Sequence, residues 1–179
     1  MTGSYLPASD LSRFVREMLE FVGFGDADAA RIRASAPLVL PRVDRLTAAL
    51  YDHFLTLPRA ARFFLRDDGT PDDTRLARRR HSLGRWLRDT AELALTPEFS
   101  YSLLTIGLAH SHRPHGPGGT VPPHLMVGAM SLVQTELPKL FAAGLSADDA
   151  LAASVAWNKL LMVQTSVLLL GYLPPRPID

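Results

Sequence analysis

Apolar residues recur along the chain at the spacing of one face of an α-helix. The first stripe, over residues 11–22, repeats in steps of three and four, follows the capping residues Ser9 and Asp10, and ends at Gly23 and Gly25. Nothing alternates with a period of two for long enough to predict a strand. The pattern therefore predicts an all-α protein.

Proline, glycine and capping residues divide this pattern into about seven or eight helices. Asp26 predicts the cap of a second, shorter helix that Pro37 interrupts, and Pro41 predicts the first turn of a third helix that runs to Thr56. The remaining predicted elements are a brief segment over residues 58–65, a turn over 67–71, helices over 71–94 and 97–112, a loop over 113–123, a helix over 123–141 that Gly144 stops, and a last helix from the Ser146 cap to Gly171. Unequal lengths and mid-chain breaks favour crossed helices around a pocket over a symmetric four-helix bundle.

The most apolar stretch, residues 160–170, contains Gln164 and is about half the length that a bilayer-spanning helix needs. We therefore expect a buried or interface helix and no membrane contact. The N-terminal residues carry neither a basic region nor a long apolar run, so we expect no signal peptide and a cytoplasmic location. The length of 179 residues predicts one domain over residues 1–179, with a short proline-rich tail over 173–179.

Composition narrows the classes of function. Hydrophobic residues make up 47%, charged residues 21%, and the formal net charge is +1, which excludes a disordered chain and argues against nucleic-acid binding through bulk charge. The chain has no cysteine, which excludes disulfides, thiolate metal sites, cysteine nucleophiles and covalently attached c-type haem. A metal would have to rest on nitrogen or oxygen ligands, and the six histidines are the candidates.

His110 is the histidine whose position on its helix suits a buried ligand. It follows Phe99, Leu103 and Ile106 at helical spacing, so its imidazole faces inward, and Gly107 would let a flat ligand approach closely. One hypothesis is a core histidine that bonds a backbone carbonyl. The other is an axial ligand to haem iron, with its second ring nitrogen held by a carbonyl or carboxylate.

Two neighbouring histidines suggest zinc as an alternative metal. The spacing His110-x-His112-x-x-His115 supplies three nitrogens. However, imidazoles at i and i+2 of one helix cannot converge, and no nearby carboxylate completes the set. We expect His112 and His115 to be largely exposed.

Two further features bear on a ligand site. Tyr51 lies on an apolar stripe, so its hydroxyl either bonds a carbonyl or donates to a small polar ligand. The helix over residues 71–94 carries six arginines between residues 75 and 88, which suit nucleic acid, the propionates of a porphyrin, or a solvated face. On that helix His81 shares the wet face with Arg78, Arg85 and Arg88, so it is a poor second axial ligand.

Five segments together resemble the protoglobin family, which belongs to the lineage of globin-coupled sensor domains. They are Leu-Tyr-Asp-His-Phe at residues 50–54, Arg-Asp-Asp-Gly-Thr-Pro at 66–71, Gly-Arg-Trp-Leu-Arg-Asp-Thr at 84–90, Ile-Gly-Leu-Ala-His at 106–110, and Val-Pro at 121–122. The resemblance covers about residues 9–172. Each piece alone is weak, and the combination at these distances is fairly specific.

The resemblance implies a globin fold with b-type haem and an extra N-terminal helix within an extension of about residues 1–25. It assigns His110 as the proximal iron ligand and Tyr51 as the distal tyrosine. The implied cofactor site comprises His110, Tyr51, Leu83, Trp86, Phe54 and Gly107. The implied partners are O₂, CO or NO, bound as carrier or sensor, and a second copy joined through the last two long helices.

Two alternatives to a gas carrier or sensor stay open. One is a haem-free all-α signalling or interaction module, in which His110 and Tyr51 are core polar residues. The other is slow haem-dependent NO or peroxide chemistry, although the distal side shows no acid–base pair.

Overall fold

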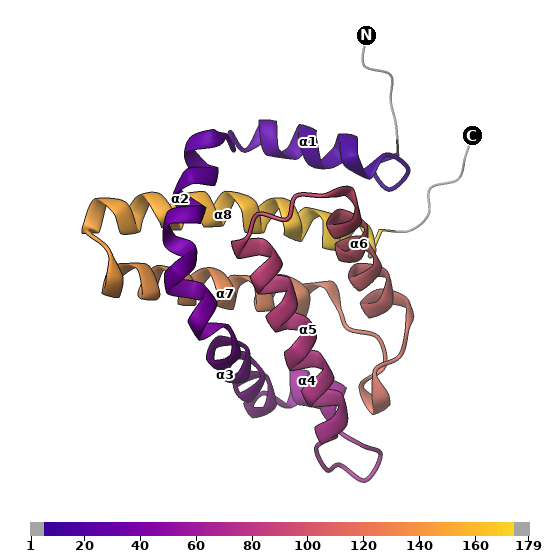
Figure 1. Cartoon of the computed structure of the whole chain (residues 1–179). Helices are drawn as coiled ribbons and strands as arrows, with labels where there is room; N and C mark the ends of the chain where they lie inside the picture. The colour runs from indigo at the N-terminus through magenta and orange to yellow at the C-terminus, as the bar shows by residue number, and fades with distance from the viewer. Residues whose placement is uncertain (1–5, 174–179) are drawn as a thin grey trace.

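A computed structural model describes residues 6–173, and within them the chain forms eight α-helices joined by short connections (Figure 1). The α-helices are α1 (Leu11–Phe21), α2 (Asp26–Val39), α3 (Val43–Thr56), α4 (Pro58–Ala61), α5 (Asp73–Ala91), α6 (Pro97–His112), α7 (Pro123–Gly144) and α8 (Ala147–Leu170). Three 3₁₀ turns are η1 (Leu40–Arg42), η2 (Arg62–Phe64) and η3 (Gly116–Gly118). Among the described residues the only β-type pairing is an isolated bridge between Leu65 and Pro71, so the all-α prediction is confirmed.

The predicted helix starts depend on local capping and most are confirmed. Asp10, Asp72, Thr96 and Ser146 each accept a hydrogen bond from a backbone N–H of the first turn that follows. These bonds satisfy donors that a helix start leaves unpaired. The starts of α1, α5, α6 and α8 are therefore encoded within a few residues of sequence.

The second helix is where the prediction was wrong. α2 has 14 residues against 11 in α1, Asp26 is its first residue after the Gly25 cap, and Pro37 lies inside it without ending it. Pro37 is exposed and costs the helix one backbone bond near its end. The direction of the chain changes instead at η1, which contains Pro41.

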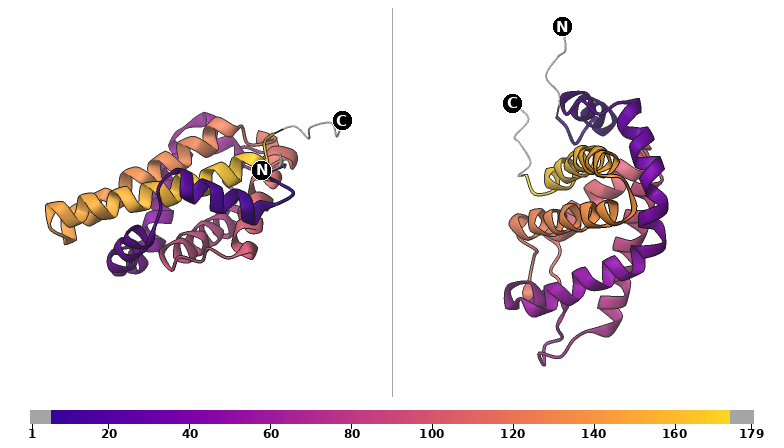
Figure 2. Two further views of the ribbon diagram at one scale, coloured as in Figure 1. Left: turned by 90° about the horizontal axis from the view of Figure 1, so that it is seen from above. Right: turned by 90° about the vertical axis from the view of Figure 1, so that its left-hand side faces the viewer.

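α8 is the central helix of the core. It packs against α1, α2, α6 and α7, and the views in Figures 1 and 2 show α7 and α8 side by side with α1 laid across α8. Trp157 is buried in this core and donates its indole N–H to Ser35 Oγ on α2 at 2.9 Å. The resemblance attributed the nearly all-round apolar character of residues 160–170 to a dimer. The single chain already buries most of that segment, because four helices surround it.

Length and composition alone would let α8 cross a membrane, and it is the one helix in residues 6–173 that passes this test. Its most apolar window is 56% buried inside the domain. The N-terminal extension is described from Leu6 onward and consists mainly of α1. The predicted proline-rich tail lies, after Leu173, outside the described residues.

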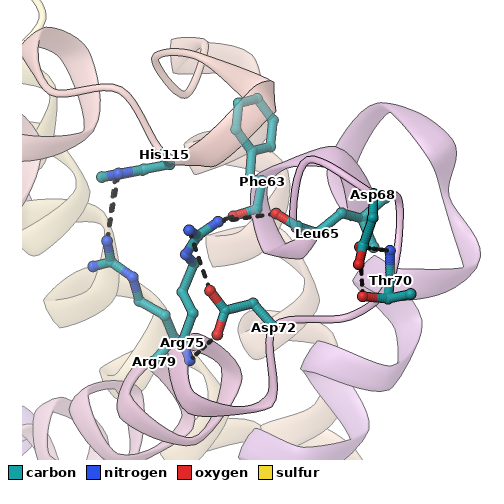
Figure 3. A network of polar contacts seen from close by, with 8 residues as sticks. All are labelled: Phe63, Leu65, Asp68, Thr70, Asp72, Arg75, Arg79 and His115. Atoms are coloured by element: carbon teal, nitrogen blue, oxygen red, sulfur yellow. Dashed lines mark hydrogen bonds and ion pairs between the residues drawn. The ribbon is translucent and has the colours of Figure 1, made fainter.

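The loop after α6 folds back over the segment after α4. Gly118 lies so close to Phe63 that a Cβ would stand 2.5 Å from the Phe63 ring, and Gly116 lies against the Leu65 carbonyl. Arg75 on α5 closes this corner by donating to the carbonyls of Phe63 and Leu65, at 3.5 and 3.1 Å (Figure 3). The loop is thereby held beside α5 at the end of α6 that carries the histidines.

Candidate functional site

His110 lies in the last turn of α6 with its ring half-buried. Its Nδ1 is 2.7 Å from the Ile106 carbonyl one turn earlier, a contact in which a neutral imidazole donates. Burial lowers the pKa of His110, so the ring is neutral at pH 7. Nδ1–H is therefore occupied by the backbone, and Nε2 carries the lone pair that a metal needs.

Tyr51 lies on α3 and is buried among aromatic side chains. Its ring makes edge-on contacts with Phe54 and Phe64, with centroids 5.5 and 5.3 Å apart. No residue between 6 and 173 hydrogen-bonds the Tyr51 hydroxyl, although the carbonyl partner was one of the predicted possibilities. Burial raises the pKa of Tyr51 to about 12, so the hydroxyl keeps its proton and is available as a donor.

Arg79 on α5 joins the two candidate residues electrostatically. Its positive charge opposes protonation of His110 and favours ionisation of Tyr51, so it lies within range of both groups. The prediction of a solvated face for the arginine helix fits the exposed Arg78 and Arg85 but not the half-buried Arg79. A sequence signal existed, because Arg79 stands three residues after Leu76 and four before Leu83, on the apolar face.

His115 was expected to be largely exposed, and this was wrong. The loop turns back so that its ring stands perpendicular to that of His110, with centroids 5.1 Å apart. Arg79 Nη2 lies 3.5 Å from both ring nitrogens of His115, which places the guanidinium against the ring (Figure 3). Burial and the nearby Arg79 charge lower the pKa of His115 to about 4, so it is neutral at pH 7.

A cavity of about 360 Å³ opens beside these residues, between α5 and the loop after α6. Its lining residues are Arg75, Arg78, Arg79, Ser82, Pro114, His115 and Gly116. Arg75 is occupied by Asp72, 3.2 Å away, and by the two carbonyls that anchor the loop. The site is therefore a cationic cavity next to an inward-facing histidine.

The other predicted site residues are placed less directly. Leu83 and Phe54 are half-buried, and Phe54 stacks on Phe64 with centroids 6.4 Å apart. Trp86 is buried and donates its indole N–H to Gln164 Oε1 on α8 at 2.9 Å, so its polar edge is committed to the helix interface. Phe64 was missed, because nothing in the segment Arg62-Phe63-Phe64 shows that it meets Tyr51.

Gly107 has a structural reason of its own. A Cβ at this position would collide with the Leu168 carbonyl oxygen and stand 3.4 Å from the Gly171 Cα. The absence of a side chain at Gly107 allows α8 to approach α6 closely, whereas the sequence analysis predicted that it would allow a flat ligand to approach. Its place in the cofactor site stays a prediction.

The exposure of the other histidines is consistent with a single histidine ligand to a metal. His53, His81, His112 and His124 are exposed. Within residues 6–173 no three histidine, cysteine, aspartate or glutamate side chains are grouped to hold a metal, so the zinc hypothesis finds no support. One neutral imidazole with a free Nε2, together with a tyrosine hydroxyl that has no hydrogen-bond partner among the described residues, is a donor set that fits haem.

Comparison with known proteins identifies the family. A search of curated proteins finds no match. Among solved structures, the chain resembles the globin domain of the Geobacter sulfurreducens globin-coupled sensor, with a TM-score of 0.69 and 18% identity over 88% of this chain and 96% of that one. At this identity the likeness shows the globin fold alone. The sequence model of the protoglobin family matches residues 12–176. The chain therefore belongs to the protoglobin family, whose globin fold implies haem and the binding of a diatomic gas.

Proposed function

We propose that this protoglobin binds haem b and reversibly takes up O₂, CO or NO as a carrier or sensor. The observation that supports this best is the state of His110, whose Nδ1 is bonded to the Ile106 carbonyl at 2.7 Å while Nε2 stays free on a half-buried, neutral ring. Haem would supply the iron, to which a diatomic gas can bind.

His110 would hold the iron through Nε2. The Ile106 carbonyl fixes the tautomer and the ring orientation, and as a hydrogen-bond acceptor it makes the imidazole a stronger donor to a metal. Gly107 anchors the same helix against α8, so the position of His110 depends on that packing.

Tyr51 would donate its hydroxyl proton to the bound gas molecule. The hydroxyl has no competing partner among the described residues, and its pKa of about 12 keeps it protonated. Phe54 and Phe64 surround the ring and exclude water from it. A hydrogen-bond donor without a competing partner favours a polar ligand such as O₂.

Reversible binding is better supported than turnover. The one histidine of α5, His81, is exposed, so α5 supplies no histidine to act as an acid or base toward a ligand. NO consumption by the oxygenated protein separates the two functions when an added electron donor returns the ferric haem to the ferrous state. An enzyme then consumes many NO molecules per haem at a sustained rate, whereas a carrier consumes NO only once per haem.

We also propose that two copies associate through α7 and α8. Leu151, Val155 and Met162 stand at i, i+4 and i+11 on α8 and are 66, 46 and 43% exposed. This outer face of α8 is mainly apolar and is interrupted at i+7 by the exposed Asn158, which accepts a hydrogen bond from Gln134 on α7. Association would remove this face from water.

The test of the haem site compares His110→Ala with the matched control His112→Ala, two residues away and exposed. Both purified variants are titrated with haemin, and the absorption spectrum is followed after reduction and addition of CO. We expect tight haem binding to be lost in His110→Ala and kept in His112→Ala. Equal binding by the two variants would refute the ligand assignment, and a wild-type protein that takes up no haemin would favour the haem-free module.

A second variant guards against simple misfolding. His110→Gly leaves a space that free imidazole fits, so added imidazole should restore a haem spectrum close to that of the wild type. Failure of imidazole to do so in a folded variant contradicts ligation by His110.

A further inference from the structure

The cavity between α5 and the loop after α6 is lined by three arginines, and two of them have no carboxylate partner within residues 6–173. Along α5, Arg75 pairs with Asp72, Arg80 with Asp52 at 2.7 Å, and Arg88 with Asp44 at 2.6 Å. Arg78 and Arg79 also line the cavity, and within residues 6–173 neither has an ion pair. Arg78 and Arg79, which line the cavity together with Arg75, are therefore among the arginines of α5 that have no carboxylate partner in the described residues.

Arg79 is the less exposed of these two and contacts the candidate haem site. It is half-buried, and its guanidinium lies against the ring of His115, which in turn contacts the ring of His110. A guanidinium that is partly desolvated without an anion loses hydration energy, which an anionic ligand would restore. Neutral His115 offers no charge to compensate for it.

The other groups that line the cavity suit the same ligand. Neutral His115 can donate or accept a hydrogen bond, whereas the Ser82 hydroxyl already donates to the Arg78 carbonyl at 2.9 Å and can only accept. Pro114 and Gly116 add no negative charge to the lining. Arg75 contributes charge, but its donors are taken by Asp72 and by the Phe63 and Leu65 carbonyls. Arg79 is therefore the main candidate donor and Arg78 the second.

We propose that this cavity is the carboxylate-binding end of the cofactor site, where Arg79, assisted by Arg78, binds the propionates of haem. This inference rests on the proposed function, because it locates the propionates of the haem that His110 would hold. The two propionates are the anionic groups of haem, and the cavity adjoins His110 through His115. Guanidinium binds carboxylate through paired N–H donors, which makes such contacts both strong and oriented.

The same cationic cavity would also suit a free anion such as phosphate, so the experiment must separate the two sources. The shared chemistry is a compact oxyanion bound by Arg79. If propionates fill the cavity, phosphate competes only in the haem-free protein.

The test uses haemin and haemin dimethyl ester, in which both propionates are uncharged, on the full chain. Affinities are measured by spectroscopic titration at low and high salt for the wild type, Arg79→Gln, Arg78→Gln, and the control Arg85→Gln on the exposed face of the same helix. We expect the wild type to bind haemin at least about tenfold more tightly than the ester, because a charge-assisted bond to a partly buried arginine is worth at least that factor.

Each variant has a distinct expected result. Arg79→Gln should lose about tenfold in haemin affinity and nothing in ester affinity, so the ester also reports that the variant folds. Arg78→Gln should lose about two- to threefold, because its side chain is exposed. Arg85→Gln should match the wild type.

Three results overturn the inference. The first is equal wild-type affinity for haemin and the ester, and the second is an equal loss with both ligands in Arg79→Gln. The third is phosphate binding of equal strength, measured by calorimetry, in haem-free and haem-loaded protein, which assigns the cavity to a free anion. A wild type that binds neither haemin nor its ester refutes the proposed function itself, and that outcome differs from all three.

Discussion

The crossing of α6 and α8 gives the sharpest stability prediction. At this crossing two glycines face each other's backbone, since a Cβ on Gly107 would collide with the Leu168 carbonyl and one on Gly171 would collide with the α6 backbone. Gly107→Ala adds one methyl group at a place where the atoms that it meets cannot rotate away. α6 or α8 must shift, and α6 carries His110.

The expected change in the free energy of unfolding is the difference between a gain in helix propensity and a cost of overpacking. Replacing glycine by alanine inside a helix gains about 1 kcal/mol. Overpacking costs about 1–3 kcal/mol, and we expect the upper end because the neighbours are backbone atoms. The net loss is about 2 kcal/mol, which lowers Tm by about 4–8 °C in a domain of this length.

Gly128→Ala is the matched control. Gly128 also lies within a helix, α7, and a Cβ there would meet nothing within 4 Å. The Gly128→Ala variant should gain only the helix-propensity contribution, about 1 kcal/mol in the free energy of unfolding, and its Tm should rise by about 2–4 °C.

Thermal and urea unfolding followed by circular dichroism measure both variants. A Gly107→Ala protein at least as stable as the wild type would refute the packing argument. If that variant were stable but failed to bind haemin, Gly107 would belong to the cofactor site, as the sequence suggested.

Two further predictions concern the gas and the dimer. Tyr51→Phe should release O₂ about three- to tenfold faster than the wild type, since one hydrogen bond of about 0.5–1.5 kcal/mol is lost, while CO release changes less. Stopped-flow kinetics of the haem-loaded protein measure both rates, and unchanged O₂ release would contradict the donor role of Tyr51. Leu151→Arg should shift a dimer to a monomer in analytical ultracentrifugation, because a charge at this 66% exposed position on the outer face of α8 would have to be buried on association. The control Leu95→Arg, at an exposed leucine between α5 and α6, should stay dimeric, and equal behaviour of the two variants would exclude this face.

Local sequence was enough to predict most of the fold. Asp10, Thr96 and Ser146 cap helices through bonds that span three residues, and the turn over residues 67–71 is equally local. His110 and Tyr51 could be proposed because helical spacing places them on apolar faces, and spacing is a property of one helix. Two prolines were misjudged. Pro41 lies in η1, before α3 begins at Val43, and Pro37 stays inside α2 because a proline near a helix end costs only one bond.

Contacts between distant segments decided the rest. The pairing of Phe64 with Tyr51 and the return of His115 to His110 depend on how loops fold back, and no periodicity encodes this. The arginines of α5 look alike in sequence, yet their roles differ because two aspartates of α3 pair with Arg80 and Arg88, and no carboxylate within residues 6–173 pairs with Arg79. Sequence spacing determines which side chains share a face, because the helix repeat is fixed by the backbone. Only tertiary packing determines what that face meets, because burial, charge pairing and cavities arise between elements.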